Sequence, residues 1–427
     1  MAQVGALPGP ATAAAVSAQR WPCWIDVDLD AIAANVRAIR RWIGPAVRLV
    51  AVVKAQAYGL GAEMVATAAL EAGADGLAVA RVQEGIRLRR HGVTSPILLL
   101  TGFAPEEAPR VVAQGLTPTV VEHAQLPSLM TASQRAGTRL PVHVKVDTGL
   151  HRYGAPLDQA LALTRTIAAA DVLELEGFFT HFATADALDL SFAREQLAAF
   201  RAATAALAGD GAQPRYLHAA NSAGTLGLRE AHFDLVRVGL GVYGYYATPA
   251  VSRASVSLQP AVTLRARVAR LLALDAGCTV GYGCSYRTTR PMRAALLTIG
   301  YADGLPGSHY RGGYVLLGGQ RADIIGRISM DQCVVDITTC PEVREGDCAV
   351  VLGQQGDELI ALDEYAELSG SIPHEALTAL GSRVPRVYWR GGEVVACATL
   401  AGEEWMDRGA SVGSSGRAQP AVPLHPA

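Results

Sequence analysis

Lys54 is the residue that the sequence most clearly marks for chemistry. It ends the apolar run 48–54, and the glycine-punctuated segment 55–61 follows it. A β-branched run of this length predicts a buried strand. Burial and neighbouring cations lower the pKa of an amine at the end of such a strand, and an unprotonated amine can attack a carbonyl. The competing interpretation is a lysine that simply extends from a strand end into solvent.

The elements that would position Lys54 form a regular series. From Trp24 to about Ser255, short apolar runs alternate with alanine-rich amphipathic stretches. Alternating β and α units predict a parallel sheet, and eight of them fit an α/β fold of the (β/α)8 TIM-barrel type. The eight predicted strands are 48–54, 76–80, 96–100, 117–121, 142–147, 175–180, 215–220 and 234–239. We expect Asp30 to cap the helix that precedes the first of them.

Reactive side chains recur at one end of these predicted strands. In a (β/α)8 barrel, chemistry collects at the C-terminal ends of the strands. The residues that fall at or just beyond such ends are Lys54, Arg152, His181, Asn221, Ser222 and Arg237. The sequence therefore predicts one site at this rim.

A second domain is predicted after about residue 255. Strands at 261–274, 293–299, 314–317, 324–330, 333–337 and 348–352 are separated by glycine turns, with one helical patch at 364–380. This pattern is typical of a mostly antiparallel β domain. We expect a disordered extension over 1–23, a barrel over 24–255, a β domain over 256–402 and a disordered tail over 403–427.

Composition and charge narrow the class of ligand. The 427 residues are 50% hydrophobic and 18% charged, with a net charge of −2, which gives no electrostatic footprint for nucleic acid. No apolar stretch is long enough to span a bilayer, and no signal peptide is recognisable. Seven cysteines without a C-x-x-C pair favour free thiols over disulfides or a metal site. We expect a cytoplasmic enzyme with a small-molecule substrate and no metal, nucleic acid or membrane partner.

Nine segments carry a resemblance to a known family. They are AVVKAQAYG (51–59), KVDTGLHR (145–152), HFATAD (181–186), NSA (221–223), RVGLGVYG (237–244), GYG (281–283), GYADG (300–304), ISMD (328–331) and RVPRVY (383–388). Each is weak alone, but nine in order across both domains are specific. The chain resembles the alanine racemases, fold-type III enzymes that use pyridoxal 5′-phosphate (PLP). The resemblance implies interconversion of L- and D-alanine, which supplies D-alanine for peptidoglycan.

The resemblance also implies a pair of catalytic residues. Lys54 would hold PLP as a Schiff base and act as the base for D-alanine, and Tyr282 would act on L-alanine from the opposite face. Racemisation needs an acid/base group on each face of the α-carbon, so a single lysine would be insufficient. A tyrosine with a pKa of about 10 needs cations nearby for this work. In the family this tyrosine reaches the cofactor of the partner subunit, so we expect a head-to-tail homodimer with shared active sites.

The cofactor contacts follow residue by residue from the resemblance. Tyr58, Ser222 and the backbone N–H groups of Gly239 and Leu240 would hold the phosphate, and Asn221 and His374 belong to the same cofactor site. Arg237 would face the ring nitrogen. A guanidinium does not give up its proton, so the nitrogen would stay unprotonated, which favours racemisation over decarboxylation or transamination.

The remaining site residues lie around the substrate. Arg152 would pair with the cofactor phenolate oxygen and the substrate carboxylate, and His181 would pack beside the ring and orient Arg237. Lys145 resembles a lysine that is carbamylated in some members, and its negative charge would then position Arg152. The residues that would line the substrate side are Tyr301, Met330 and Asp331.

Four positions depart from the family pattern and keep alternatives open. Gln56 and Leu60 replace the usual Asn and His after the lysine, His374 replaces a tyrosine, and Gly307 replaces an entrance arginine. Another small amino acid such as serine is therefore an alternative substrate. A same-fold amino-acid decarboxylase is an alternative enzyme, disfavoured by Arg237. A PLP carrier protein or a non-catalytic sensor on the same scaffold is the alternative outside catalysis.

Overall fold

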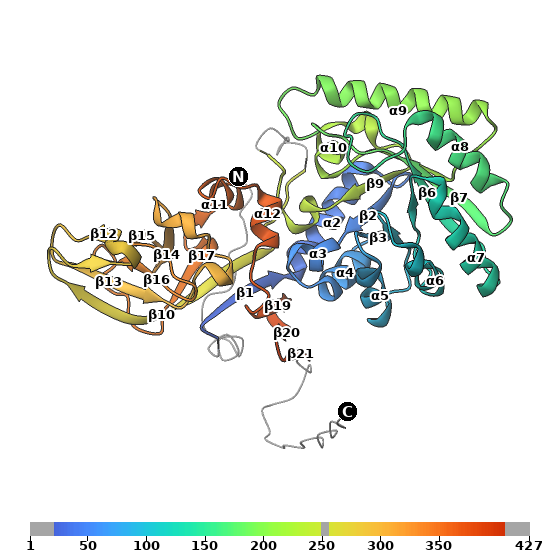
Figure 1. Cartoon of the computed structure of the whole chain (residues 1–427). Coiled ribbons are helices and arrows are strands. Elements are labelled where there is room, and N and C mark those ends of the chain that lie inside the picture. Colours follow the sequence, from blue (N-terminus) through green and yellow to red (C-terminus); the bar gives the residue numbers. More distant parts are fainter. Residues whose placement is uncertain (1–20, 249–255, 406–427) are drawn as a thin grey trace, which may run out of the picture.

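The protein folds as an α/β barrel and a β domain that lie side by side, as Figure 1 shows for this computed structural model. The structure describes residues 21–248 and 256–405. Residues 1–20 of the predicted extension over 1–23 and residues 406–427 of the predicted tail over 403–427 lie outside the described residues. The two-domain α/β architecture predicted from the sequence is confirmed.

Eight parallel strands form the barrel, one for each predicted run. They are β2 (Arg48–Val52), β3 (Gly76–Val79), β4 (Ile97–Leu99), β5 (Thr119–Val120), β6 (Leu140–Lys145), β7 (Leu173–Phe179), β8 (Tyr216–His218) and β9 (Leu235–Val238). They pair in the orders β4-β3-β2-β9 and β5-β6-β7-β8. The N–H of Leu99 donates to Thr117 O (2.8 Å) and that of Asp234 to Leu217 O (3.0 Å), which closes the ring between these two halves.

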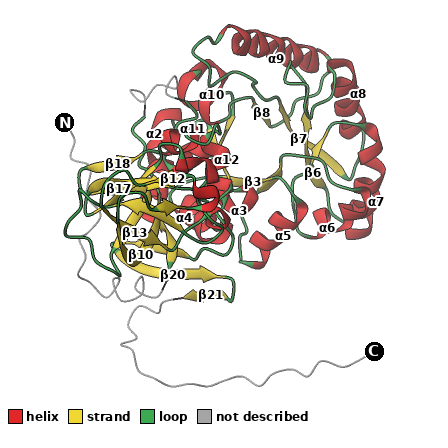
Figure 2. Ribbon diagram, turned by 60° about the vertical axis from the view of Figure 1, so that its left-hand side comes forward, coloured by secondary structure: helices red, strands yellow, loops and turns green. Residues whose placement is uncertain are grey.

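Helices cover the outside of the strands (Figure 2). They are α2 (Leu29–Ile43), α4 (Ala62–Glu71), α5 (Val82–Arg90), α6 (Ala108–Ala113), α7 (Leu126–Ala136), α8 (Leu157–Ala168), α9 (Ser191–Gly209) and α10 (Ser222–Gly227). In α2, Ile32, Val36 and Ile39 are fully buried, as their spacing predicts. The cap of α2 is Asp28, whose carboxylate accepts from Ala31 N–H (2.9 Å), so the prediction of Asp30 was wrong by two residues.

The second domain is built on an eleven-stranded sheet in the order β18-β17-β14-β15-β16-β13-β10-β1-β19-β20-β21. Its strands are β1 (Cys23–Asp28), β10 (Val262–Leu274), β13 (Met292–Leu297), β14 (Tyr314–Leu317), β15 (Gln320–Ile325), β16 (Cys333–Asp336), β17 (Cys348–Gln355), β18 (Glu358–Ile360), β19 (Arg386–Arg390), β20 (Glu393–Thr399) and β21 (Gly402–Trp405). A hairpin of β11 (Thr279–Val280) and β12 (Tyr286–Arg287) adds a separate ribbon.

Several boundaries of this domain differ from the prediction. β1 pairs antiparallel with β10 and parallel with β19, so residues 24–28 belong to this sheet rather than to the barrel. β15 ends before residues 326–330, which were predicted to continue it. The single helical patch is two helices, α11 (Leu362–Glu367) and α12 (Pro373–Thr378). The predicted tail from residue 403 begins inside β21.

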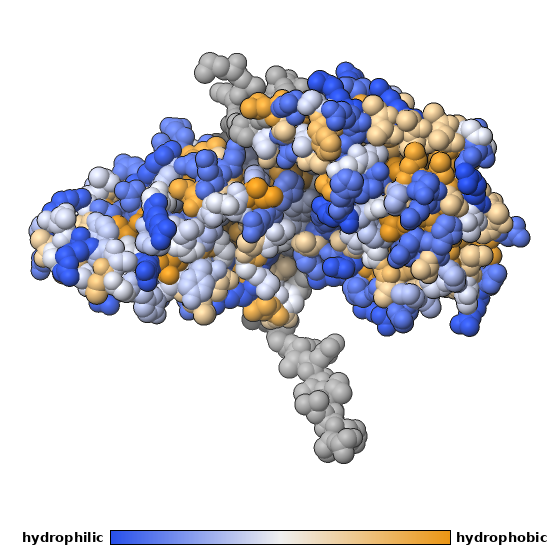
Figure 3. Space-filling model, turned by 45° about the horizontal axis from the view of Figure 1, so that its top comes forward, coloured by the Kyte–Doolittle hydropathy of each residue, from blue (hydrophilic) through white to orange (hydrophobic). Residues whose placement is uncertain are grey.

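The described surface and interior show no membrane segment or metal cluster. None of the described helices is long and apolar enough to cross a bilayer. Among the described residues, no group of three or more His, Cys, Asp or Glu side chains could hold a metal ion. On the face drawn in Figure 3, hydrophobic residues lie in small groups among hydrophilic ones.

Candidate active site

Lys54 opens a left-handed turn at the end of β2. This turn, α3 (Lys54–Tyr58), holds Ala55, Gln56, Ala57 and Tyr58 at φ values between 51° and 58°. Left-handed backbone costs an L-residue roughly 1–2 kcal/mol at each position. The turn is closed by hydrogen bonds, such as that from Gly59 N–H to Ala55 O (2.8 Å). Strain of this kind persists only where the surroundings fix it, and it clusters at functional sites.

Residues of the β domain make many of the contacts that hold this turn in place. Arg386 donates to Gly59 O (2.9 Å), and its other N–H groups bond three carbonyls of the segment 380–384. A Cβ atom on Gly61 would lie 1.9 Å from the Tyr388 hydroxyl, so that ring packs directly on the glycine. α12 also packs against α3. Both domains therefore hold the lysine turn.

Two amines at the barrel rim have lowered pKa values. Burial, and then the positive charge of Arg152, lower the pKa of Lys54, while Glu84 opposes the shift. Lys145 lies at the end of β6, is 5% exposed, and has its ammonium group 5.5 Å from the centre of the Phe179 ring. Burial and then Arg237 lower its pKa to about 7. Both amines are thus easier to deprotonate than an ordinary lysine, as expected for Lys54.

Arg237 is a buried cation at the end of β9. It donates to His218 Nδ1 (2.6 Å), to Thr180 O (2.8 Å) and to Ala219 O (3.0 Å), and it lies 3.4 Å from His181 Nδ1. None of the ion pairs within the described residues includes Arg237. Burial lowers its pKa to about 9, which still leaves the guanidinium protonated at neutral pH.

The imidazole of His181 completes this positive region. Burial, and then the charges of Arg237, Lys145, Arg152 and Lys54, lower its pKa well below the ordinary value. His181 is therefore a neutral ring beside Arg237, Lys145, Arg152 and Lys54. The side chain of Arg152 is exposed at this rim.

Neutral donors gather beside the lysine turn. Ser222 Oγ accepts from Gly239 N–H (2.9 Å), and a Cβ atom on Gly239 would lie 2.4 Å from the Tyr58 hydroxyl. Burial raises the pKa of Tyr58 to about 12, so this hydroxyl stays protonated. The His374 ring lies 5.9 Å from that of Tyr58.

Asn221 and Leu240 flank these donors. The Asn221 side chain caps α10 by accepting from Gly224 N–H (2.9 Å), which fixes Ser222 at the first position of the helix. Leu240 is fully buried directly after Gly239. The structure thus brings together every predicted cofactor residue, from Lys54 and Tyr58 to the loop 239–240 and His374.

The predicted residues of the β domain form a second group. Tyr282 is 71% exposed in the turn between β11 and β12, and Tyr301 and Met330 are each 51% exposed. Tyr301 N–H donates to Ser329 O (3.0 Å), which places it beside Met330. Asp331 pairs with Arg383 (2.6 Å).

This second group does not meet the lysine within one chain. Figure 1 shows the hairpin β11–β12 at the end of the β domain that is farthest from the barrel. No hydrogen bond, ion pair or ring contact within residues 21–248 and 256–405 joins Tyr282, Tyr301, Met330 or Asp331 to Lys54. Within one subunit Tyr282 therefore does not face Lys54, and the pairing predicted from the sequence is between two subunits.

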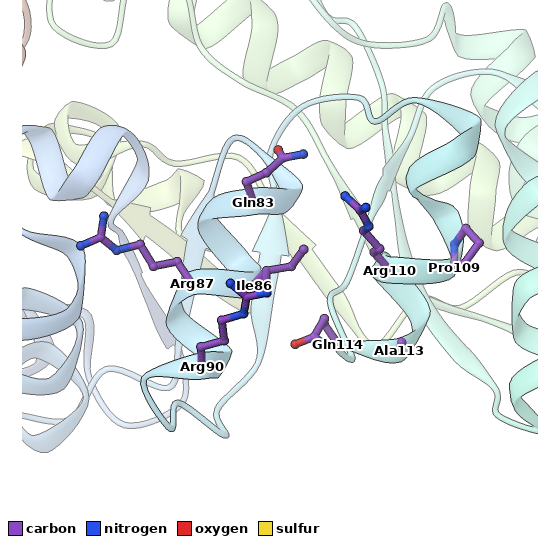
Figure 4. Close-up of a pocket in the computed structure, with 8 residues that line it drawn as sticks. All are labelled: Gln83, Ile86, Arg87, Arg90, Pro109, Arg110, Ala113 and Gln114. Atoms are coloured by element: carbon purple, nitrogen blue, oxygen red, sulfur yellow. The ribbon is translucent and has the colours of Figure 1, made fainter. Parts of the chain in front are cut away.

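Sequence reasoning missed three residues beneath the site. His218, His143 and Glu176 continue the contacts of Arg237 into the barrel. Each lies in a strand that was predicted, and histidines within apolar runs were the available signal. A groove of about 620 Å³ between α5 and α6, shown in Figure 4, contains none of the predicted site residues.

Comparisons with known proteins agree with this geometry. Family models for the N-terminal and C-terminal domains of alanine racemase match residues 27–247 and 261–388. Alanine racemase from Symbiobacterium thermophilum is 44% identical over 372 residues, which cover 87% of this chain and 98% of that protein.

Two solved structures share the fold across nearly their whole length. Alanine racemase from Bacillus anthracis with bound L-Ala-P is 36% identical, with a TM-score of 0.83 and coverage of 89% of this chain and 98% of that one. Alanine racemase from Bartonella henselae with covalently bound pyridoxal phosphate is 31% identical, with a TM-score of 0.77 and coverage of 86% and 100%. The chain belongs to the alanine racemase family.

Proposed function

We propose that this protein interconverts L- and D-alanine with PLP bound covalently to Lys54. The observation that carries the proposal is the charge of the site. Lys54, Lys145, Arg152 and Arg237 converge at the barrel rim, and none of them has a carboxylate within ion-pair distance among the described residues. Lys145 and Arg237 are buried, and buried cations need negative partners. A cofactor with a phosphate and a phenolate oxygen, and a substrate with a carboxylate, supply them.

The neutral donors fit the phosphate end of the same cofactor. The Tyr58 and Ser222 hydroxyls and the loop at Gly239 converge where a Cβ atom would not fit. Arg237 would face the ring nitrogen, and because a guanidinium keeps its proton, that nitrogen would stay unprotonated. When bound, PLP supplies an electron sink that makes the substrate α-proton acidic.

This chain's own groups hold and move that proton. Lys54 would hold the cofactor and would take or return the α-proton of the substrate on one face. Its lowered pKa supports this role, because a base works best when its pKa is near the working pH. Arg152 binds the substrate carboxylate. Asn221 and His374 belong to the phosphate side, and His181 packs beside Arg237.

The opposite face needs a second group, and we assign it to Tyr282 from another copy of the chain. Tyr282, Tyr301, Met330 and Asp331 all belong to the β domain, and the three large side chains among them are at least half exposed. A head-to-tail homodimer would bring this group over the barrel rim of the partner and complete the site. The small-amino-acid substrate, alanine or alternatively serine, would lie between the two groups.

Lys145 is proposed to carry a carbamate. The amine has a pKa of about 7 and is surrounded by cations. The ammonium first loses one proton, and the neutral amine then adds to CO₂ and releases a second, so that a buried cation becomes an anion beside Arg152 and Arg237.

We predict that protein exposed to ¹³C-bicarbonate shows a slowly exchanging carbamate signal by ¹³C NMR, lost in Lys145→Ala. Lys54 shares the rim, so Lys54→Ala is the matched control and should retain the signal. A spectrum of the parent without this resonance would contradict the modification.

The reaction class can be settled in D₂O. PLP-loaded protein incubated with L-alanine is expected to yield α-deuterated D- and L-alanine without release of CO₂, and Lys54→Ala is expected to yield neither. Release of CO₂ would favour the decarboxylase alternative. A parallel incubation with L-serine measures the choice of substrate.

A further inference from the structure

A chain of hydrogen bonds runs from Arg237 through the interior of the barrel. Arg237 bonds His218 Nδ1 at 2.6 Å, His218 Nε2 lies 2.9 Å from His143 Nδ1, and His143 Nε2 lies 3.1 Å from the Glu176 carboxylate. His218 and His143 are 0% and 3% exposed. These contacts join three strands, β9, β8 and β6, to a carboxylate on a fourth, β7.

The donors and acceptors in this chain permit a single arrangement. A guanidinium only donates, so His218 Nδ1 must accept. Burial, and then Arg237, lower the pKa of His218 well below its ordinary value, so the ring is neutral and its proton is on Nε2. That proton points to His143 Nδ1, which must accept in turn. The remaining proton of His143 is then on Nε2, where Glu176 accepts it.

Packing holds each ring in place. The Phe179 ring stacks on His218 with the ring centres 4.4 Å apart and the planes 8° apart. A Cβ atom on Gly177 would lie 2.4 Å from His143 Nδ1, so only glycine leaves room for that imidazole. The rings therefore have little freedom to rotate, and their proton positions depend on the acceptor at the end of the chain.

We propose that Glu176 is a positioning residue, which acts through His143 and His218 to keep His218 Nδ1 available as the acceptor that orients Arg237. If the side chain at position 176 could not accept a hydrogen bond, the proton of His143 or His218 could move from Nε2 to Nδ1. His218 would then present an N–H to the N–H groups of Arg237, and the guanidinium would turn away from its place at the rim. The effect on catalysis rests on the proposed function, whereas the predicted tautomers of His143 and His218 do not depend on it.

Nitrogen NMR of protein labelled with [¹⁵N]histidine tests the arrangement directly. We expect His143 and His218 to show the neutral Nε2–H form in the parent, with or without PLP. Glu176→Gln keeps an oxygen acceptor and should keep both tautomers. Glu176→Leu removes it and should give mixed tautomers. An Nδ1–H tautomer of His218 in the parent, or unchanged spectra in Glu176→Leu, would overturn the proposal.

Kinetics then test the role in the reaction. Glu176→Leu is expected to lower kcat by roughly 10- to 100-fold, the range seen for residues that orient a metal-binding histidine, with Glu176→Gln close to the parent. Glu174→Leu, the same change two residues earlier on β7, is the matched control and should have no such effect. In an Arg237→Lys background the loss from Glu176→Leu should largely disappear.

Two results separate the two proposals. An undiminished loss in the Arg237→Lys background would show that Glu176 acts by another route and would overturn the positioning role. Absence of deuterium exchange in the parent would instead refute the proposed racemisation, and the NMR result on the tautomers would be unaffected.

Discussion

At the scale of single residues, Gln56 occupies a backbone conformation that suits a shorter amide. Its φ is 58°, and asparagine tolerates this region better because its side chain can bond the local backbone. We predict that Gln56→Asn raises the free energy of unfolding by about 1 kcal/mol, measured by urea denaturation. Gln134→Asn, on the exposed side of α7, should instead lower it by a few tenths because asparagine is the weaker helix former. A loss of stability in Gln56→Asn would contradict this account.

The imidazole of His374 gives the cofactor site a dependence on pH. Burial, and then Lys54, lower its pKa from 6.5, while Asp186 opposes the shift. The imidazolium therefore forms mainly below pH 6.5, where it adds a cation beside the phosphate. We predict that the ratio of the PLP affinity of the parent to that of His374→Tyr rises roughly fivefold as the pH falls from 7.5 to 5.5. The phosphate of PLP titrates in the same way with both proteins. The same dependence of PLP affinity on pH in both would therefore contradict a role for His374.

The residues that carry chemistry were visible in the sequence to different degrees. Lys54 and Arg237 could be found because each closes an apolar strand, and strand ends meet at one rim. The tautomer chain below Arg237 could not, since it depends on which side chains of β6, β7 and β8 point inward at the same height. The exposure of Tyr282 was also hidden, because it is set by how the β domain is turned relative to the barrel.

At the scale of elements, the glycine after the lysine turn is fixed by the other domain. Gly61 has φ 95° and a Cβ atom there would meet the Tyr388 hydroxyl, whereas Gly73 has φ 105° and a Cβ atom there would have no neighbour within 4 Å. Gly73→Ala should cost about 1–2 kcal/mol for the backbone alone. Gly61→Ala should cost about 1–3 kcal/mol more because the methyl group collides with the ring. Thermal unfolding of the two variants measures the difference, and equal losses would show that Tyr388 simply moves aside.

The elements of the barrel were predictable because each strand is buried and flanked by its neighbours in sequence. The place of β1 in the second sheet was not predictable. Its partner strands β10 and β19, which contain Arg265 and Arg386, are far along the chain, and the sequence of β1 alone does not indicate them. The division of 364–380 into α11 and α12 depends on Pro373, which starts the second helix at its first position. Asp28 was overlooked as the cap of α2 because it also ends β1.

At the scale of the whole molecule, the separation of Lys54 from Tyr282 predicts that inactive variants rescue one another. Lys54→Ala and Tyr282→Phe are mixed under conditions that exchange subunits. In a shared-site dimer, a mixed pair has one doubly defective site and one intact site. Random mixing makes about half of the dimers mixed, so activity should return to about a quarter of the parent value.

The controls for this mixture are each variant exchanged with itself, which should stay inactive. Exchange is verified independently by mass spectrometry of differently labelled subunits. No recovery after verified exchange would place both groups in one chain.

The clamp on the lysine turn has a consequence for how the protein is made. Gly59 and Arg386, which bond one another, are 327 residues apart along the chain. At ribosomal speeds of 5–20 residues per second, the turn waits roughly 15 to 65 s for the arginine that holds it. During that interval the barrel strands can pair, but the backbone after Lys54 is free to relax from its left-handed form. The contact of Arg386 with the left-handed turn is therefore completed only after the second domain has been synthesised.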